Sequence, residues 1–323
     1  MNIENWFVSC RIIPVLAGLM LFFCMEGNAM AENKDRTEVV SSVSNQGCTV
    51  DKFEVYSKSM DRYIKVVVTL PPEYKENAGK KYPILYTLHG SGAPFDTYNE
   101  MSPLHKALKN KPMIFTCFDG DSMSMYVDSQ YPQKDYYRGA GKKGTPKQPP
   151  AKSLFSTFFF DEFMPCVDKY YHVNTTQRMI TGFSMGGFGS FHYMLTKPEM
   201  FVSISSQSGA FSSLLEAQGK EWMRPLLGSF SQNQEKYEAI DFYNRIKKYA
   251  DNKAKLPPVY LTCGTEDSLM ESNDKMSAYL EKYGYSCEYV KTAGKHNWAF
   301  WVGSIEAVVD FHWKTLPENS ENK

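Results

Sequence analysis

The chain has 323 residues, of which 42% are hydrophobic, and its formal net charge at pH 7 is zero. This length and composition fit one large globular domain that buries a sizeable core. A balanced total charge gives no sign of a basic face, which argues against a nucleic acid or an anionic membrane as a partner.

The first 31 residues have the pattern of a secretory signal peptide. An apolar run of 14 residues, 12–25, precedes the small-residue site Ala29-Met30-Ala31. The run is too short to span a bilayer comfortably. We therefore expect cleavage after Ala31, a secreted or periplasmic location, and no membrane association of the mature chain. An uncleaved anchor, including a lipoprotein anchor at Cys24, is the alternative.

The rest of the chain is expected to form a polar linker over residues 32–49, a single domain over 50–315 and a polar tail over 316–323. Its five cysteines are Cys48, Cys117, Cys166, Cys263 and Cys287. Cys117 and Cys263 lie in apolar runs, where a free thiol behaves as a small hydrophobic group. No spacing of cysteine and histidine indicates a metal site, and we expect neither a metal nor an organic cofactor.

Strand-like and helix-like segments alternate from residue 50 onward, which predicts an α/β fold with a mostly parallel sheet and helices on both faces. An antiparallel hairpin is expected over 52–57 and 63–70. Further strands are expected at 84–88, 113–118, 178–183, 201–206, 259–262 and 287–290, which makes eight. Helices are expected at 153–170, 187–196, 235–249, 271–283 and 303–313, the fourth ending at a left-handed Gly284.

Two segments, 122–151 and 211–233, match no regular element and are expected to be insertions over one face of the sheet. Ligands of α/β domains bind at the carboxyl ends of the strands, so both segments are candidate walls of a substrate site. For residues 139–148, rich in lysine and glycine, a surface loop is the better interpretation. For the aromatic residues 126–137, a substrate wall and a loop core are both open.

The segment TGFSMGGFGS, residues 181–190, places Ser184 at the centre of a GxSxG pattern with Gly182 and Gly186. The pattern alone is weak evidence, because a serine in a glycine-rich turn gives the same letters. A short apolar strand precedes it and a helix follows it, which is the context of a nucleophile elbow.

A serine hydroxyl needs a base at hydrogen-bond distance and a third group that orients the base. The chain order serine, acid, histidine leaves His296, which follows the last expected strand, or His312, which falls inside the last expected helix. The acid should follow the strand 259–262. Asp267 is the preferred residue and Glu266 is its competitor, because spacing cannot rank two adjacent carboxylates.

Negative charge that develops on a substrate carbonyl oxygen needs preorganised donors, which are usually backbone amides. Met185, directly after the serine, should supply one amide at the start of the helix. The loop LHGSG at residues 88–92 should supply the other, and Ser91 is our candidate.

Taken together, these residues resemble the esterase D and feruloyl esterase branch of the α/β-hydrolases, which includes tributyrin-type esterases and the mycolyltransferases. The segments that carry the resemblance are LYTLHGSG (85–92), FFFDEFMPCVDKYYHV (158–173), TGFSMGGFGSF (181–191), CGTEDSL (263–269) and GKHNWAFW (294–301). The resemblance implies the α/β-hydrolase fold and a catalytic triad of Ser184, Asp267 and His296. Trp298 and Trp301 recur beside the histidine of the family, where packing and substrate contact are both open.

The resulting expectation is an exported serine carboxylesterase that forms an acyl-enzyme with a small-molecule or carbohydrate-linked ester. Feruloyl, acetyl and other short-chain esters are open as substrates, and Trp298 and Tyr126 are candidate substrate contacts. Two alternatives remain. One is an acyltransferase that uses a sugar or glycerol hydroxyl, and the other is a non-catalytic carbohydrate-binding protein on the same scaffold. The sequence predicts neither the oligomeric state nor a disulfide pairing.

Overall fold

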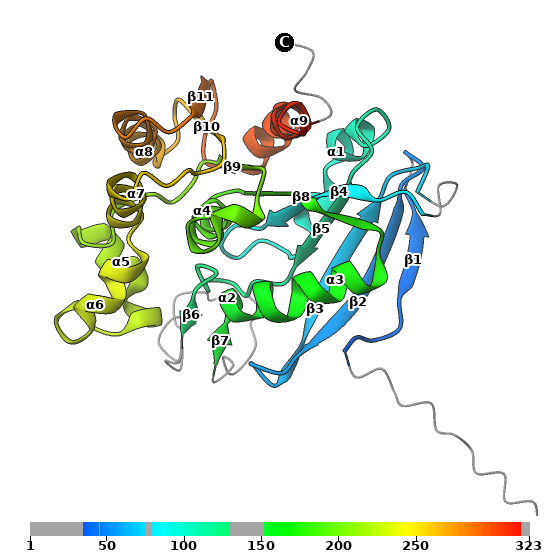
Figure 1. The fold of residues 1–323 in the computed structure, drawn as a ribbon, viewed down its shortest axis with the longest axis horizontal. Coiled ribbons are helices and arrows are strands. Elements are labelled where there is room, and N and C mark those ends of the chain that lie inside the picture. Colours follow the sequence, from blue (N-terminus) through cyan, green and yellow to red (C-terminus); the bar gives the residue numbers. More distant parts are fainter. Residues whose placement is uncertain (1–34, 45, 75–78, 130–151, 318–323) are drawn as a thin grey trace, which may run out of the picture. The chain divides into compact units, whose positions relative to one another are not determined.

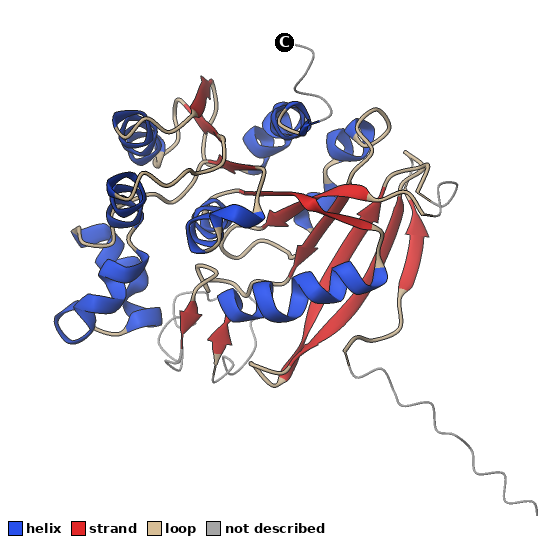
Figure 2. Cartoon of the chain, viewed as in Figure 1, coloured by secondary structure: helices blue, strands red, loops and turns tan. Residues whose placement is uncertain are grey.

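The computed structural model describes residues 35–44, 46–74, 79–129 and 152–317. The expected signal peptide, the segment 139–148 and nearly all of the expected tail lie outside these residues. A nine-stranded sheet with the order β1-β2-β3-β5-β4-β8-β9-β10-β11 runs through the described domain (Figures 1 and 2). Its strands are β1 (Val40–Val43), β2 (Thr49–Ser57), β3 (Arg62–Leu70), β4 (Tyr82–Leu88), β5 (Ile114–Phe118), β8 (Val173–Gly182), β9 (Ser203–Gln207), β10 (Val259–Gly264) and β11 (Cys287–Thr292).

The sheet is antiparallel from β1 to β5 in its spatial order and parallel from β5 to β11. Every residue of β4, β5, β9 and β10 is buried, as expected of parallel strands that carry helices on both faces. The α/β-hydrolase prediction is therefore confirmed at the level of fold class, and all eight expected strands are present.

The sheet has nine strands where eight were expected, and the additional strand is β1. β1 lies inside residues 32–49, which we expected to be a linker, and it pairs with β2 as an antiparallel edge strand. All four of its side chains are exposed, so no buried face marked it in the sequence. A separate two-stranded sheet, β6 (Asp128–Ser129) with β7 (Ser153–Leu154), was also missed, because two residues are too short for a strand pattern.

The helices cover both faces of the sheet (Figure 1). They are α1 (Ser102–Ala107), α2 (Phe155–Thr157), α3 (Met164–Tyr170), α4 (Met185–Thr196), α5 (Ala217–Leu227), α6 (Phe230–Ile240), α7 (Phe242–Asp251), α8 (Met270–Lys282) and α9 (Trp298–Lys314). The buried side chains form separate clusters on the two faces of the sheet, and β4 contributes to both. Ile84 and Tyr86 pack in the cluster with α3 and α4, and Leu85 packs in the cluster with α1 and α9.

Residues 211–233, expected to be irregular, contain α5 and the start of α6. The sequence did not predict α5 because it contains Gly219 and Pro225, and glycine and proline both disfavour a helix. Gly219 is required there because a Cβ at this position would lie 2.1 Å from the carbonyl oxygen of Ser213. The helix expected over 235–249 is in fact two helices. Asp241 separates them in an extended conformation and caps α7 by accepting a hydrogen bond from the amide of Asn244 at 3.0 Å.

Two smaller expectations are confirmed. Gly284 follows α8 with φ of 74°, and Cys117 and Cys263 are buried strand residues. The five cysteines of the described residues are all free thiols. None of the described helices is long and apolar enough to cross a membrane.

Candidate active site

Ser184 lies in the turn between β8 and α4, with φ of 55° and ψ of −118°. This backbone conformation is strained for a residue with a side chain and is typical of a nucleophile elbow. The flanking glycines are required by contact. A Cβ on Gly182 would lie 2.2 Å from the backbone of Gly186, and a Cβ on Gly186 would lie 1.9 Å from the carbonyl oxygen of Leu88. The expected strand, turn and helix context is present.

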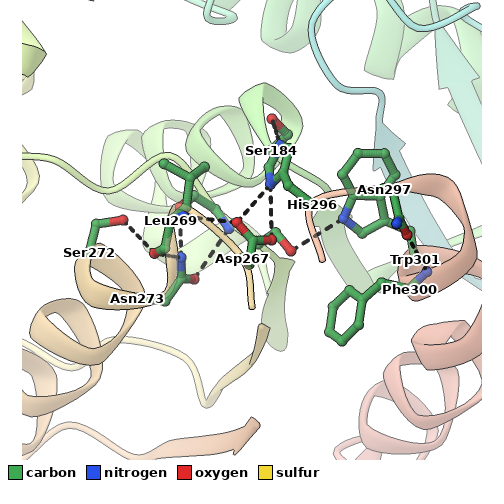
Figure 3. A network of polar contacts seen from close by, with 11 residues as sticks. Ser184, Asp267, Leu269, Ser272, Asn273, His296, Asn297, Phe300 and Trp301 are labelled. Atoms are coloured by element: carbon green, nitrogen blue, oxygen red, sulfur yellow. Dashed lines mark hydrogen bonds and ion pairs between the residues drawn. The ribbon is translucent and has the colours of Figure 1, made fainter. Parts of the chain in front are cut away.

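His296 lies in the loop between β11 and α9, and its Nε2 is 2.9 Å from Oγ of Ser184 (Figure 3). The next residue, Asn297, is the N-cap of α9, where its side chain accepts a hydrogen bond from the amide of Phe300 at 3.2 Å. Because the helix begins directly after this cap, the imidazole stays on the loop and reaches the end of β8. The side chain of His296 is 29% exposed.

Asp267 follows β10, and both of its carboxylate oxygens are 3.0 Å from Nδ1 of His296 (Figure 3). The amide of Leu269 donates to Oδ1 at 2.8 Å, and the side chain of Asp267 has no exposed surface. Its competitor Glu266 is 61% exposed and pairs with Lys295 at 3.5 Å. The structure thus brings Ser184, His296 and Asp267 into one hydrogen-bonded chain and leaves Glu266 outside it.

The surroundings of Asp267 favour its ionised form, so a charged carboxylate faces the imidazole. Burial alone raises the pKa of this carboxyl, but hydrogen bonds from His296, the Leu269 amide and Ser208 outweigh burial and hold the pKa below its usual value. Ser208 was missed by the sequence analysis, because a serine in the segment SSQSG carries no distinguishing pattern.

The other histidine candidate, His312, is fully buried in α9. Its two ring nitrogens face Oγ of Ser203 and Oγ of Ser205, each at 2.8 Å. It therefore has no position from which it could serve Ser184.

Backbone amides converge beside Ser184. The amide of Met185 begins α4, and among the described residues neither this amide nor that of Ser91 has a hydrogen-bond acceptor. The loop that carries Ser91 passes close to the elbow, since a Cβ on Gly90 would lie 3.3 Å from Cβ of Ser184. These two amides are therefore available for an oxyanion.

His89 holds this loop in place. Its Nε2 accepts from the amide of Gly120 at 2.9 Å, so Nδ1 carries the proton and donates to the carbonyl of Gly90 at 2.8 Å. Burial lowers the pKa of His89 and keeps it neutral. Because a peptide group is planar, fixing the Gly90 carbonyl also fixes the direction of the Ser91 N–H.

The interpretation of Tyr126 as a substrate contact is wrong. Its side chain has no exposed surface, and its hydroxyl donates to the carbonyl of His89 at 3.0 Å. It is the core of the loop under the oxyanion site, and residues 130–137 of the same aromatic segment lie outside the described residues. Trp298 is 40% exposed at the start of α9, so its ring retains surface for a ligand.

Across the described ranges, no three side chains of histidine, cysteine, aspartate or glutamate come together as metal ligands would.

The chain is similar in sequence to known esterases. A sequence family described as "Putative esterase" matches residues 57–311. An acetyl esterase from Caldicellulosiruptor saccharolyticus is 20% identical over 277 residues, which are 77% of this chain and 92% of the relative.

Two solved structures share the fold. An S-formylglutathione hydrolase from Agrobacterium tumefaciens superposes with a TM-score of 0.69 at 15% identity, covering 87% of this chain and 100% of the other. A ferulic acid esterase superposes with a TM-score of 0.62 at 21% identity, covering 83% and 99% respectively.

Proposed function

This chain belongs to the esterase family that matches residues 57–311 and is a carboxylic ester hydrolase, and from this premise we propose that Ser184, His296 and Asp267 are its catalytic triad. The observation that carries the proposal is the continuous chain of hydrogen bonds from the buried carboxylate through the imidazole to the strained serine. A carboxylate on one side of an imidazole makes the opposite nitrogen the base for the hydroxyl.

The first half of the reaction forms an acyl-enzyme. Nε2 of His296 takes the proton of Ser184 while Oγ bonds to the ester carbonyl carbon, and Asp267 stabilises the imidazolium. The amides of Met185 and Ser91 donate to the oxyanion of the tetrahedral intermediate. The bond to the alkoxide then breaks, and the imidazolium gives its proton to the leaving alcohol.

The second half regenerates the enzyme. His296 takes a proton from water, the hydroxide attacks the acyl carbon, and the second tetrahedral intermediate collapses with the release of the acid and the return of the proton to Ser184. Every proton in the cycle passes through Nε2 of one imidazole, so the cycle requires no group beyond the three side chains and the two amides.

Removal of the nucleophile tests this assignment. For Ser184→Ala we expect turnover of a p-nitrophenyl ester to fall by at least about a thousandfold while the fold stays intact. A matched control is Ser272→Ala, which removes a hydroxyl from α8 that donates to the carbonyl of Leu269 at 2.9 Å. Unchanged hydrolysis by Ser184→Ala, with a normal circular dichroism spectrum, would rule out the assignment.

For the substrate we propose acetyl or feruloyl esters, including those attached to carbohydrate. An acetyl esterase is a relative over 92% of its own length, and a ferulic acid esterase shares the fold. A panel of p-nitrophenyl acetate, methyl ferulate and acetylated xylan tests this proposal. A preference for long-chain acyl esters over all three would contradict it.

Export of the chain is part of the proposal. The support is the apolar run at residues 12–25 and the small-residue site that ends at Ala31. N-terminal sequencing of the protein from its native host should then give Glu32 as the first residue. An intact Met1 on the active enzyme would contradict the proposed cleavage.

A further inference from the structure

Trp301 of α9 contacts the segments that carry two of the triad residues, Ser184 and His296, and it also contacts Ser208. Its ring stacks on Phe183, the residue before the nucleophile, at 4.4 Å between centroids and an interplanar angle of 21°. It also meets the ring of His296 edge to face at 5.1 Å and 89°. Its indole Nε1 donates to Oγ of Ser208 at 3.3 Å, the dashed line that reaches Trp301 in Figure 3.

Ser208 directly follows β9 and is completely buried. Its amide donates to the carbonyl of Thr262 at 2.8 Å, which holds it beside β10, the strand that leads to Asp267. Its φ is 51°, a conformation that glycine adopts without strain and serine does not. A buried serine in a strained conformation needs a compensating interaction, and its side chain provides one.

The hydroxyl of Ser208 has one proton, so the direction of each hydrogen bond can be assigned. An indole nitrogen only donates and a carboxylate only accepts. Ser208 therefore accepts from Trp301 and keeps its own proton for Asp267, whose pKa this hydroxyl helps to hold down. Burial raises the pKa of the Cys263 thiol to about 12, so this group stays protonated and is only a weak acceptor for the Ser208 proton.

We propose that Ser208 and Trp301 are positioning residues that extend the triad, so that hydrogen bonds run from Trp301 through Ser208, Asp267 and His296 to Ser184. The inference rests on the proposed function and deepens it. Ser208 gives the carboxylate a further donor, and Trp301 holds both Ser208, through its indole N–H, and the His296 ring, through an edge-to-face contact. Trp301 is thereby assigned to the support of the triad instead of to substrate contact.

The expected consequence is a change in kcat and in its pH dependence, because neither residue is placed against the substrate. A buried carboxylate that loses one donor titrates at higher pH. The other titratable groups that face Asp267 are His296, Cys263 of β10 and Tyr289 of β11, and none of them changes in the variants below.

The test compares Ser208→Ala and Trp301→Phe with the wild-type full chain on p-nitrophenyl acetate. We expect kcat to fall by about tenfold in Ser208→Ala, which loses one hydrogen bond to a charged group, and by less than that in Trp301→Phe, which loses a hydrogen bond to a neutral hydroxyl. KM should stay within about twofold, and the acid limb of the kcat profile should move to higher pH. The double variant should be no worse than Ser208→Ala alone, since Trp301 then has no acceptor to lose.

Two further variants separate positioning from folding. Ser208→Gly relieves the strain at φ of 51°, so it should be more stable than Ser208→Ala and have the same kinetic defect. Trp313→Phe changes a tryptophan of the same helix away from the triad loops and should keep the wild-type pH profile.

Wild-type kcat and a wild-type pH profile in both Ser208→Gly and Ser208→Ala would overturn the proposal. So would a loss of activity that only follows the loss of folded protein, with the pH profile unchanged. Neither result would affect the assignment of the triad, which depends on Ser184→Ala.

Discussion

Ser184 and His296 lie 2.9 Å apart, and Ser205 and His312 lie 2.8 Å apart in the interior of the same domain. The first imidazole faces a carboxylate and is partly exposed, and its serine is held in a strained turn. The second imidazole is fully buried, has a serine hydroxyl at each nitrogen, and its two serines lie in the regular strand β9. Both pairs have hydrogen-bond distance between serine and histidine, so this distance alone does not separate them. We propose that the carboxylate, the access for substrate and the free amides make only the first pair reactive.

The largest effect is expected when the carboxylate of Asp267 is removed. In Asp267→Asn the amide can donate to Nδ1 of His296, which moves the ring proton to Nε2 and leaves no acceptor for the proton of Ser184. We expect kcat to fall by about ten-thousandfold, with little change in the far-ultraviolet circular dichroism spectrum. A loss of less than about tenfold in steady-state assays would show that the carboxylate is not required.

The two histidines should respond in opposite ways to truncation. His296→Ala should lower kcat by at least about a thousandfold with an intact fold. His312→Ala leaves the hydroxyls of Ser203 and Ser205 without their partner in the core, so it should cost about 3 kcal/mol of stability. Its activity per folded molecule should stay near that of the wild type. Urea denaturation combined with kinetics distinguishes the two results, and a specific kinetic defect in His312→Ala would break the comparison.

The burial of His312 should also make the stability of the folded protein depend on pH. Burial lowers the pKa of His312 from 6.5 to about 3. The unfolded chain therefore binds a proton below pH 6.5 that the folded chain does not, and stability is present above pH 6.5 and falls as the pH drops toward 3. Between pH 6.5 and 4.5 this one group should remove about 2 kcal/mol.

The variant His312→Gln has no titrating group at this position, so its urea midpoint should depend less on pH over the same interval. An equal pH dependence in the variant and the wild type would show that His312 does not stay neutral in the folded protein.

The smallest effect is expected at Glu266, the acid that the sequence could not exclude. Glu266→Gln removes an exposed carboxylate that pairs with Lys295, so kcat and stability should each change by less than about twofold or about 0.5 kcal/mol. A loss of activity as large as that of Asp267→Asn would reverse the assignment of the acid.

The sequence predicted features that depend on local backbone geometry. The glycines around Ser184, the turn that carries His296 and the end of β10 are encoded within a few residues each, and all three appeared where expected. The order of these elements along the chain then limited the possible partners of the serine. This is why Ser184 and His296 could be proposed as partners before their distance was known.

Features that depend on contacts between distant segments could not be predicted. Ser208 reaches Asp267 across 59 residues of chain and Trp301 across 93, and no local pattern records either contact. Tyr126 was misassigned for the same reason, since its burial depends on packing against Tyr193 and Phe155. The strand β1 exposes all four of its side chains, so it gave no pattern of buried residues in the sequence.

The central claim is that one of the two serine and histidine pairs is chemically competent. Treating the intact protein with a fluorophosphonate and mapping the adduct by peptide mass spectrometry tests this claim most directly. The account predicts one adduct, on Ser184, with no label on Ser203 or Ser205 and none on any residue of Ser184→Ala. An active enzyme whose adduct lies on another serine, or that hydrolyses esters with Ser184 unlabelled at saturating probe, would contradict it.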